Sequence, residues 1–310
     1  MDKPSATPEW PFRSLLFIPA NKSDWIRKSP RFAADAIIMD LEDAVPPEQK
    51  KSARDSAREG AQFLRTQGIG ALVRVNALAD GGIDDVLGVM CAGLDAVVLP
   101  KLDNVRQIQE LADVLSYAEG RAGLAHGSVG IMALPETAAA MCDARAIAAA
   151  SPRVKSIMGA LTDRFDETVV FNGDIATAAG YRPTAEGPEQ LYLASKMVLD
   201  ARAGGASHPV CTLLGTRIGD ESGTRKLAMR ARDLGYSGAA CVHPGQVAVV
   251  NELFRPTRNE CDFAQGVLDA LADAQTKGLW AVNFRGIMID QASVERARGT
   301  LAEAKRYGIV

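Results

Sequence analysis

Short apolar segments recur along the chain, and longer segments with a helical pattern of polar and apolar positions separate them. Most of these apolar segments end at a proline or at a polar residue. They cover residues 15–18, 36–39, 71–75, 96–99, 129–134, 156–161, 209–214 and 239–242. Because continuous apolar strands are typical of a parallel sheet covered on both faces, the eight segments predict buried parallel strands.

The segments between these strands show the spacing of amphipathic helices. The clearest helical patterns cover residues 46–68, 104–115, 137–150, 188–202 and 222–234. Strand–helix units repeated in this order predict a (β/α)₈ TIM barrel. A doubly wound open sheet is the alternative, but the nucleotide-binding motifs G-x-G-x-x-G and G-x-x-x-x-G-K-[ST] that many such folds carry are absent.

The chain is longer than one barrel. A barrel of this kind takes about 250 residues, so residues 12–254 are predicted to form it. Residues 1–11, which contain three prolines, are predicted to be a flexible tail. Residues 255–310 carry further helical patterns at 261–275 and 293–307 and are predicted to be a C-terminal helical extension.

Composition narrows the possible classes of protein. The chain is 47% hydrophobic and 24% charged with a net charge of −3, which favours a globular protein and argues against a dedicated nucleic-acid binder. No apolar run approaches the roughly 20 residues of a membrane span. Five widely spaced cysteines without C-x-x-C, and an N-terminus without the apolar core of a signal peptide, predict a cytoplasmic protein.

Polar residues follow several predicted strands, where the loops of a barrel converge on one mouth. Glu136 and Asp163 follow adjacent strands and predict a Mg²⁺ site with one carboxylate from each. Arg74, at the end of the third strand, is expected to neutralise a substrate carboxylate or an enolate oxygen. The alternative is a structural ring of salt bridges at the barrel rim.

Two other features have a functional and a structural interpretation. The loop from Asn21 to Lys28 is locally basic, so Lys22, Arg27 and Lys28 either hold ligand phosphates or lie on the solvated face of a capped helix. His243 either acts as a base or ligand or caps the chain before Pro244, and capping is the favoured interpretation.

Seven short motifs together resemble the citrate lyase β-subunit and malyl-CoA lyase family. The resemblance covers residues 13 to about 300, nearly the whole chain. The motifs are RSLLFIPAN (13–21), DLEDAV (40–45), VRVN (73–76), LPK (99–101), PET (135–137), VHPGQ (242–246) and GIMID (286–290).

This resemblance implies a barrel enzyme, usually trimeric, that cleaves or forms a carbon–carbon bond next to a CoA thioester. Glu136 corresponds to the first Mg²⁺ carboxylate of the family and Arg74 to the arginine on the substrate oxygen. Asp290 corresponds to an acid that a C-terminal segment carries into a neighbouring subunit's site. The basic residues expected to contact CoA are Arg13, Lys22, Arg27 and Lys28.

The loop after the sixth strand departs from the family, which usually reads Gly-Ala-Glu-Asp there. Thr162 takes the position of the second metal ligand, and Asp163, one residue later, is predicted to replace it. The expected reaction is Mg²⁺-dependent cleavage or formation of citryl-CoA or malyl-CoA, with an oxo acid and acetyl-CoA as partners. The alternatives are a malyl-CoA-type thioesterase, a CoA-independent 4-hydroxy-2-oxo-acid aldolase and a weakly active subunit of a larger lyase complex.

Overall fold

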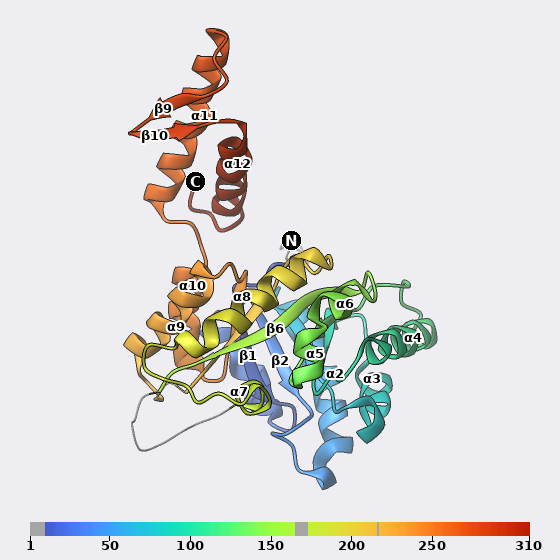
Figure 1. The fold of residues 1–310 in the computed structure, drawn as a ribbon. Helices are drawn as coiled ribbons and strands as arrows, with labels where there is room; N and C mark the ends of the chain where they lie inside the picture. The colour runs from blue at the N-terminus through green and yellow to red at the C-terminus, as the bar shows by residue number, and fades with distance from the viewer. Residues whose placement is uncertain (1–9, 165–172, 216) are drawn as a thin grey trace. The chain divides into compact units, whose positions relative to one another are not determined.

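The computed structural model describes residues 10–164, 173–215 and 217–310 (Figure 1). The chain divides into two compact units, Met1–Asn251 and Glu252–Val310, which are described one at a time below. The boundary expected after residue 254 lies three residues beyond this division. Of the expected N-terminal tail, residues 1–9 lie outside the described part of the chain.

The first unit is a closed barrel of eight parallel strands. In chain order the strands are β1 (Ser14–Pro19), β2 (Ala36–Asp40), β3 (Gly70–Arg74), β4 (Ala96–Leu99), β5 (Gly130–Ala133), β6 (Val154–Thr162), β7 (Val210–Leu214) and β8 (Gly238–Cys241). Each strand pairs with the next, and β1 also pairs with β8, with Leu15 opposite Ala240. The predicted (β/α)₈ barrel is therefore confirmed, and this closure rules out the open sheet.

Helices follow the strands in the order that the sequence pattern predicted. They are α1 (Ser23–Lys28), α2 (Lys50–Thr66), α3 (Gly82–Val89), α4 (Val105–Ala122), α5 (Ala138–Cys142), α6 (Ala144–Ala149), α7 (Asp174–Ala179), α8 (Pro188–Ala203), α9 (Glu221–Asp233) and α10 (Val247–Leu253). The single helix expected over 137–150 is interrupted at Asp143, which ends α5 and precedes α6. The short helix α7 was not predicted, because six residues are too few for a clear apolar period.

The second unit contains two long helices and a β-hairpin. Helices α11 (Arg258–Thr276) and α12 (Gln291–Arg306) extend the two helical patterns seen in the sequence, and β9 (Val282–Phe284) pairs with β10 (Ile287–Ile289) between them. Arg285 and Gly286 connect the strands with φ values of 50° and 83°, as a tight hairpin turn requires. Val267, Leu271, Ile289 and other apolar side chains form a core within this unit. None of the helices in the described residues is long and apolar enough to cross a membrane.

Candidate active site

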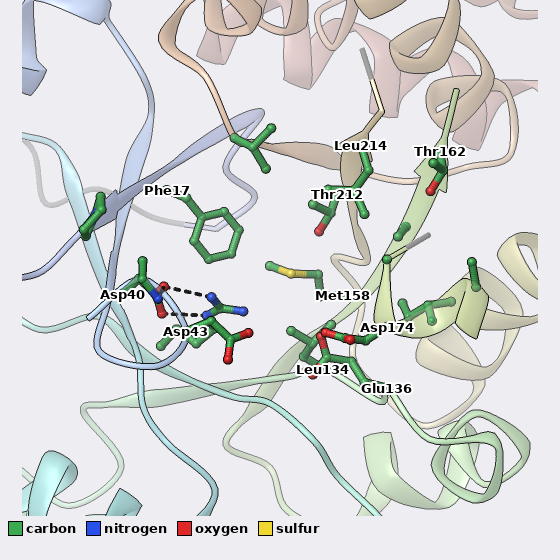
Figure 2. Close-up of a pocket in the computed structure, with 18 of the residues that line it drawn as sticks. Phe17, Asp40, Asp43, Leu134, Glu136, Met158, Thr162, Asp174, Thr212 and Leu214 are labelled. Atoms are coloured by element: carbon green, nitrogen blue, oxygen red, sulfur yellow. Dashed lines mark hydrogen bonds and ion pairs between the residues drawn. The ribbon is translucent and has the colours of Figure 1, made fainter. Parts of the chain in front are cut away.

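A cavity of about 420 Å³ opens at the carboxyl ends of the barrel strands (Figure 2). Asp40, Arg74, Thr162 and Leu214 are the last residues of β2, β3, β6 and β7, and all four line the cavity. Parallel strands in a closed barrel bring residues that are far apart in sequence to one mouth, which is where barrel enzymes carry their chemistry.

Arg74 is the one cation among the described residues that line this cavity, and two buried carboxylates hold its side chain. Its Nε and Nη2 donate to the two oxygens of Asp40 at 2.7 and 2.8 Å, and its Nη1 lies 3.0 Å from Glu42 Oε2. Burial lowers the pKa of Arg74, but the hydrogen bonds and charge of Asp40 and the charge of Glu42 outweigh burial and raise the pKa above its ordinary value. The guanidinium therefore stays charged and fixed in one orientation.

Lys101 extends this network of charges. Its Nζ lies 2.6 Å from Glu42 Oε1 and 3.3 Å from Asp43 Oδ1. Burial raises the pKa of Glu42, and the neighbouring cations Arg74 and Lys101 offset only part of that increase. An ion-pair network of the kind expected from a structural ring is thus present at the rim, and Arg74 belongs both to it and to the cavity.

Glu136 lines the cavity beyond the end of β5. Its Oε2 accepts the backbone N–H of Lys101 at 3.0 Å, and Lys101 adopts a left-handed backbone with φ 51°. The pKa of Glu136 is raised to about 7, and burial is the largest cause. The N–H of Lys101 and the charge of Arg74 lower the pKa, whereas the charges of Glu42 and Asp174 raise it. A carboxyl group whose pKa is about 7 can gain or lose a proton near neutral pH, and its ionised form can bind a cation.

The acidic residues that line the cavity are Asp40, Asp43, Glu136 and Asp174, and the last of these is the first residue of α7. Figure 2 shows the carboxylates of Asp174 and Glu136 close together, and the charge of Asp174 contributes to the raised pKa of Glu136. Asp163 is not among the residues that line the cavity, and its Oδ1 lies 3.0 Å from Nζ of Lys226 on α9. The structure thus brings Arg74 and Glu136 together but leaves Asp163 outside their cavity.

Sequence reasoning missed Asp174 because it considered only the residues that directly follow each strand. Asp174 comes twelve residues after the end of β6. A local signal was nevertheless available, since glycine followed by aspartate is a common helix start and an acid in the first turn is favoured by the helix dipole.

The basic residues expected to contact CoA lie away from the cavity lining. Arg13 precedes β1, at the amino end of the barrel strands, and forms an ion pair with Asp35 at 2.7 Å. Lys22, Arg27 and Lys28 lie on or next to α1, which follows the carboxyl end of β1, and all three are exposed. These three are therefore on the same side of the barrel as the cavity, whereas Arg13 is on the opposite side.

Asp290 and His243 both act as helix caps. In the second unit, Asp290 Oδ1 accepts the backbone N–H groups of Ala292 and Ser293 at 3.0 and 3.3 Å at the start of α12. In the first unit, His243 Nδ1 accepts the N–H of Gly245 at 3.1 Å, as the capping interpretation expects. A role of Asp290 in chemistry would therefore come in addition to a structural role.

Comparison with known proteins identifies relatives along nearly the whole chain. The model of the HpcH/HpaI aldolase/citrate lyase family matches residues 13–244. A citrate lyase subunit beta-like protein of Deinococcus radiodurans is 36% identical over 94% of this chain and 96% of its own length. A (3S)-malyl-CoA thioesterase of Cereibacter sphaeroides is 31% identical over 95% of each chain.

Solved structures also resemble this chain and agree with its match to the HpcH/HpaI aldolase/citrate lyase family. The crystal structure of protein CitE from Mycobacterium tuberculosis, in complex with magnesium, acetoacetate and coenzyme A, superposes with a TM-score of 0.71 at 26% identity. That comparison covers 94% of this chain and 98% of the other. The resemblance inferred from short motifs is therefore confirmed.

Proposed function

Because the chain belongs to the HpcH/HpaI aldolase/citrate lyase family and is a lyase, we propose that it cleaves or forms a 3-hydroxyacyl-CoA such as malyl-CoA or citryl-CoA. The products of cleavage would be an oxo acid and acetyl-CoA. The observation that carries this proposal is the arrangement of Glu136, Asp174 and Arg74 around one cavity at the carboxyl ends of the strands. The relative crystallised with magnesium, acetoacetate and coenzyme A supports it.

The two carboxylates fit a magnesium ion. No group of three or more His, Cys, Asp or Glu gathers for a metal within the described ranges. Of the four acidic residues that line the cavity, Asp40 is paired with Arg74 and Asp43 with Lys101, so Glu136 and Asp174 are the carboxylates that would bind a cation. Mg²⁺ commonly binds through one or two carboxylates and keeps several waters, which leaves positions for a chelating substrate. The ion would supply Lewis acidity to the substrate hydroxyl and carboxylate. In this proposal Asp174 takes the place that the sequence assigned to Asp163.

Arg74 would stabilise the negative charge that develops as the bond breaks. Cleavage passes the electron pair of the carbon–carbon bond to the thioester as an enolate. Nε and Nη2 of Arg74 each donate one N–H group to Asp40, and Nη1 forms an ion pair with Glu42 at 3.0 Å. The guanidinium is therefore oriented in advance, and N–H groups that do not donate to Asp40 would donate to the enolate oxygen, so little reorganisation is needed during the reaction.

The enolate carbon would then take a proton from Asp290 of a neighbouring chain in a homotrimer. Exposed apolar side chains of the second unit, Trp280 and Met288 among them, support assembly with another copy. Lys22, Arg27 and Lys28 would contact the phosphates of CoA. For Arg13, the proposed contact with CoA rests only on its place in the motif RSLLFIPAN (13–21). The five free cysteines support a location in the cytoplasm, where thiols stay reduced.

Thioester hydrolysis is the second candidate function, because relatives with 31% identity include a (3S)-malyl-CoA thioesterase. The same cavity would serve it if water reached the thioester. Detection of free CoA and malate, in place of acetyl-CoA and glyoxylate, would favour this alternative.

A matched pair of variants tests the metal site. We expect Asp174→Asn to lower Mg²⁺-dependent turnover and Mg²⁺ affinity by more than tenfold, since it removes one of about two protein ligands. Asp163→Asn, which lies outside the cavity lining, serves as the control and should retain both. Equal losses in the two variants, or wild-type turnover that is the same in EDTA as in Mg²⁺, would contradict the proposed site.

A further inference from the structure

The side chain of Lys50, the first residue of α2, lies against the loop of residues 41–45 that follows β2. Its Nζ donates to the backbone oxygens of Leu41 and Glu42 at 2.9 and 3.1 Å and to Asn76 Oδ1 at 2.5 Å. All three acceptors are neutral, and no carboxylate among the described residues forms an ion pair with Lys50. This half-buried ammonium group therefore directs its three N–H donors at backbone and amide oxygens.

The carboxylates that hold Arg74 belong to this loop and to the strand end before it. Asp40 bonds Arg74 through both of its oxygens (Figure 2), and the same two oxygens accept the N–H groups of Glu42 and Ala44 at 3.0 and 3.2 Å. Glu42 in turn lies 3.0 Å from Nη1 of Arg74. The orientation of the guanidinium therefore depends on the backbone of the loop, where Lys50 binds two consecutive carbonyl groups.

Asn76 connects the loop to the strand that carries Arg74. It lies two residues beyond Arg74, and its Nδ2 donates to the oxygen of Leu41 at 3.1 Å and to Asp85 Oδ2 at 2.6 Å. The backbone N–H of Asn76 also donates to Asp85 Oδ2, at 2.9 Å. Asn76 and Asp85 are buried, so these contacts fix Asn76 Oδ1 as an acceptor for Lys50. Lys50 thus joins the end of β2 to the end of β3.

Charge gives a second reason for a cation at this position. Three carboxylates lie at the end of β2 and in the loop: Asp40, Glu42 and Asp43. Arg74 and Lys101 are the two cations that form ion pairs with them among the described residues. The ammonium group of Lys50, bound to the backbone of the same loop, supplies a third positive charge, which reduces the cost of burying ionised carboxylates there.

We propose that Lys50 is a positioning residue for Arg74, because it fixes the loop that carries the ion-pair partners of the guanidinium. The effect on turnover rests on the proposed lyase function, in which Arg74 stabilises the enolate. Glu136 and Asp174, which would bind Mg²⁺, lie beyond β5 and at the start of α7, and Lys50 forms none of its three hydrogen bonds there. Loss of Lys50 should therefore slow the chemical step and leave the affinity for Mg²⁺ unchanged.

Lys50→Met tests the proposal on the intact protein, and Lys51→Met, at the exposed next residue of α2, is the matched control. Hydrogen–deuterium exchange, measured without substrate, should be at least about fivefold faster at the amides of Glu42 and Ala44 in Lys50→Met. Turnover of malyl-CoA should show a kcat lowered by about 10–100-fold. The Kd for Mg²⁺ should change by less than about twofold, because the ligand carboxylates keep their own contacts. Lys51→Met should match the wild-type protein in all three measurements.

Chemical rescue separates positioning from a general loss of structure. Lys50→Ala removes the side-chain atoms beyond Cβ, and propylammonium has the same three carbons and ammonium group. Added propylammonium should raise the kcat of Lys50→Ala several-fold. Tetramethylammonium has the same charge but no N–H donor and should not raise it. Equal turnover with the two ions would overturn the proposal.

Two results with Lys50→Met would also overturn the proposal. One is loop exchange and kcat that remain at wild-type values, and the other is a Kd for Mg²⁺ that rises as much as kcat falls. If the wild-type chain does not turn over malyl-CoA, but loop exchange accelerates in Lys50→Met as expected, the lyase proposal fails and the placement of the loop by Lys50 stands.

Discussion

Mg²⁺ binding to the barrel cavity is expected to strengthen as the pH rises through 7. The ion binds the ionised form of a carboxylate, and burial raises the pKa of Glu136 to about 7 in the metal-free protein. A group with this pKa is ionised in about one-tenth of the molecules at pH 6 and about nine-tenths at pH 8. The apparent Kd for Mg²⁺ should therefore fall about tenfold between these two pH values.

Calorimetric titration of Mg²⁺ at constant ionic strength, in buffers of about pH 6 and pH 8, measures this change. The Glu136→Gln variant is the control: it retains the shape of the side chain but cannot ionise, so its weaker affinity should vary far less with pH. A wild-type Kd that is the same at both values, or larger at the higher one, would refute the assignment of Glu136 as a metal ligand whose proton must first leave.

Three further outcomes follow from the described contacts. Arg74→Met should lower the free energy of unfolding by about 3–5 kcal/mol in urea titrations, since it leaves two buried carboxylates without their main cation; a loss below about 1 kcal/mol would contradict this. Burial raises the pKa of Glu119, but hydrogen bonds from Arg153 and from backbone N–H groups outweigh burial and lower the pKa to about 2. The ionised Glu119 therefore stabilises the folded state at pH values above its unfolded pKa near 4.5, and this stability is lost as the pH falls toward 2. Glu119→Gln should therefore reduce the acid sensitivity of unfolding, and an unchanged dependence would count against it. Asp290→Asn retains the helix cap and should lower turnover without lowering the melting temperature; full activity would remove Asp290 from the mechanism.

The barrel was predictable because its signals are local and repeated. Each strand is a short run of buried apolar residues, and residues such as Asp40 and Arg74 are the last of their strands. Once eight such strands are placed in a barrel, topology brings their ends together without further information. The pairing of Arg74 and Glu136 in one cavity follows from that topology.

Other features depend on contacts that the sequence pattern does not encode. Asp174 lines the cavity from the short helix α7, which begins twelve residues after β6 ends. Over that separation, the number of residues after the strand does not predict where a side chain lies. Asp163 directly follows β6, yet its carboxylate lies against Lys226, a residue 63 positions later in the chain. The β9–β10 hairpin has three-residue strands, too short for an alternating pattern to stand out.

Identification of the products formed from malyl-CoA in the presence of Mg²⁺ tests the central claim most directly. The purified chain is incubated with malyl-CoA, and the acyl-CoA species and organic acids are separated by liquid chromatography and identified by mass spectrometry. We predict acetyl-CoA and glyoxylate in equal amounts, formed at a rate that EDTA abolishes. Free CoA and malate, or unchanged malyl-CoA under conditions where the protein is folded and binds Mg²⁺, would contradict carbon–carbon bond cleavage at this cavity.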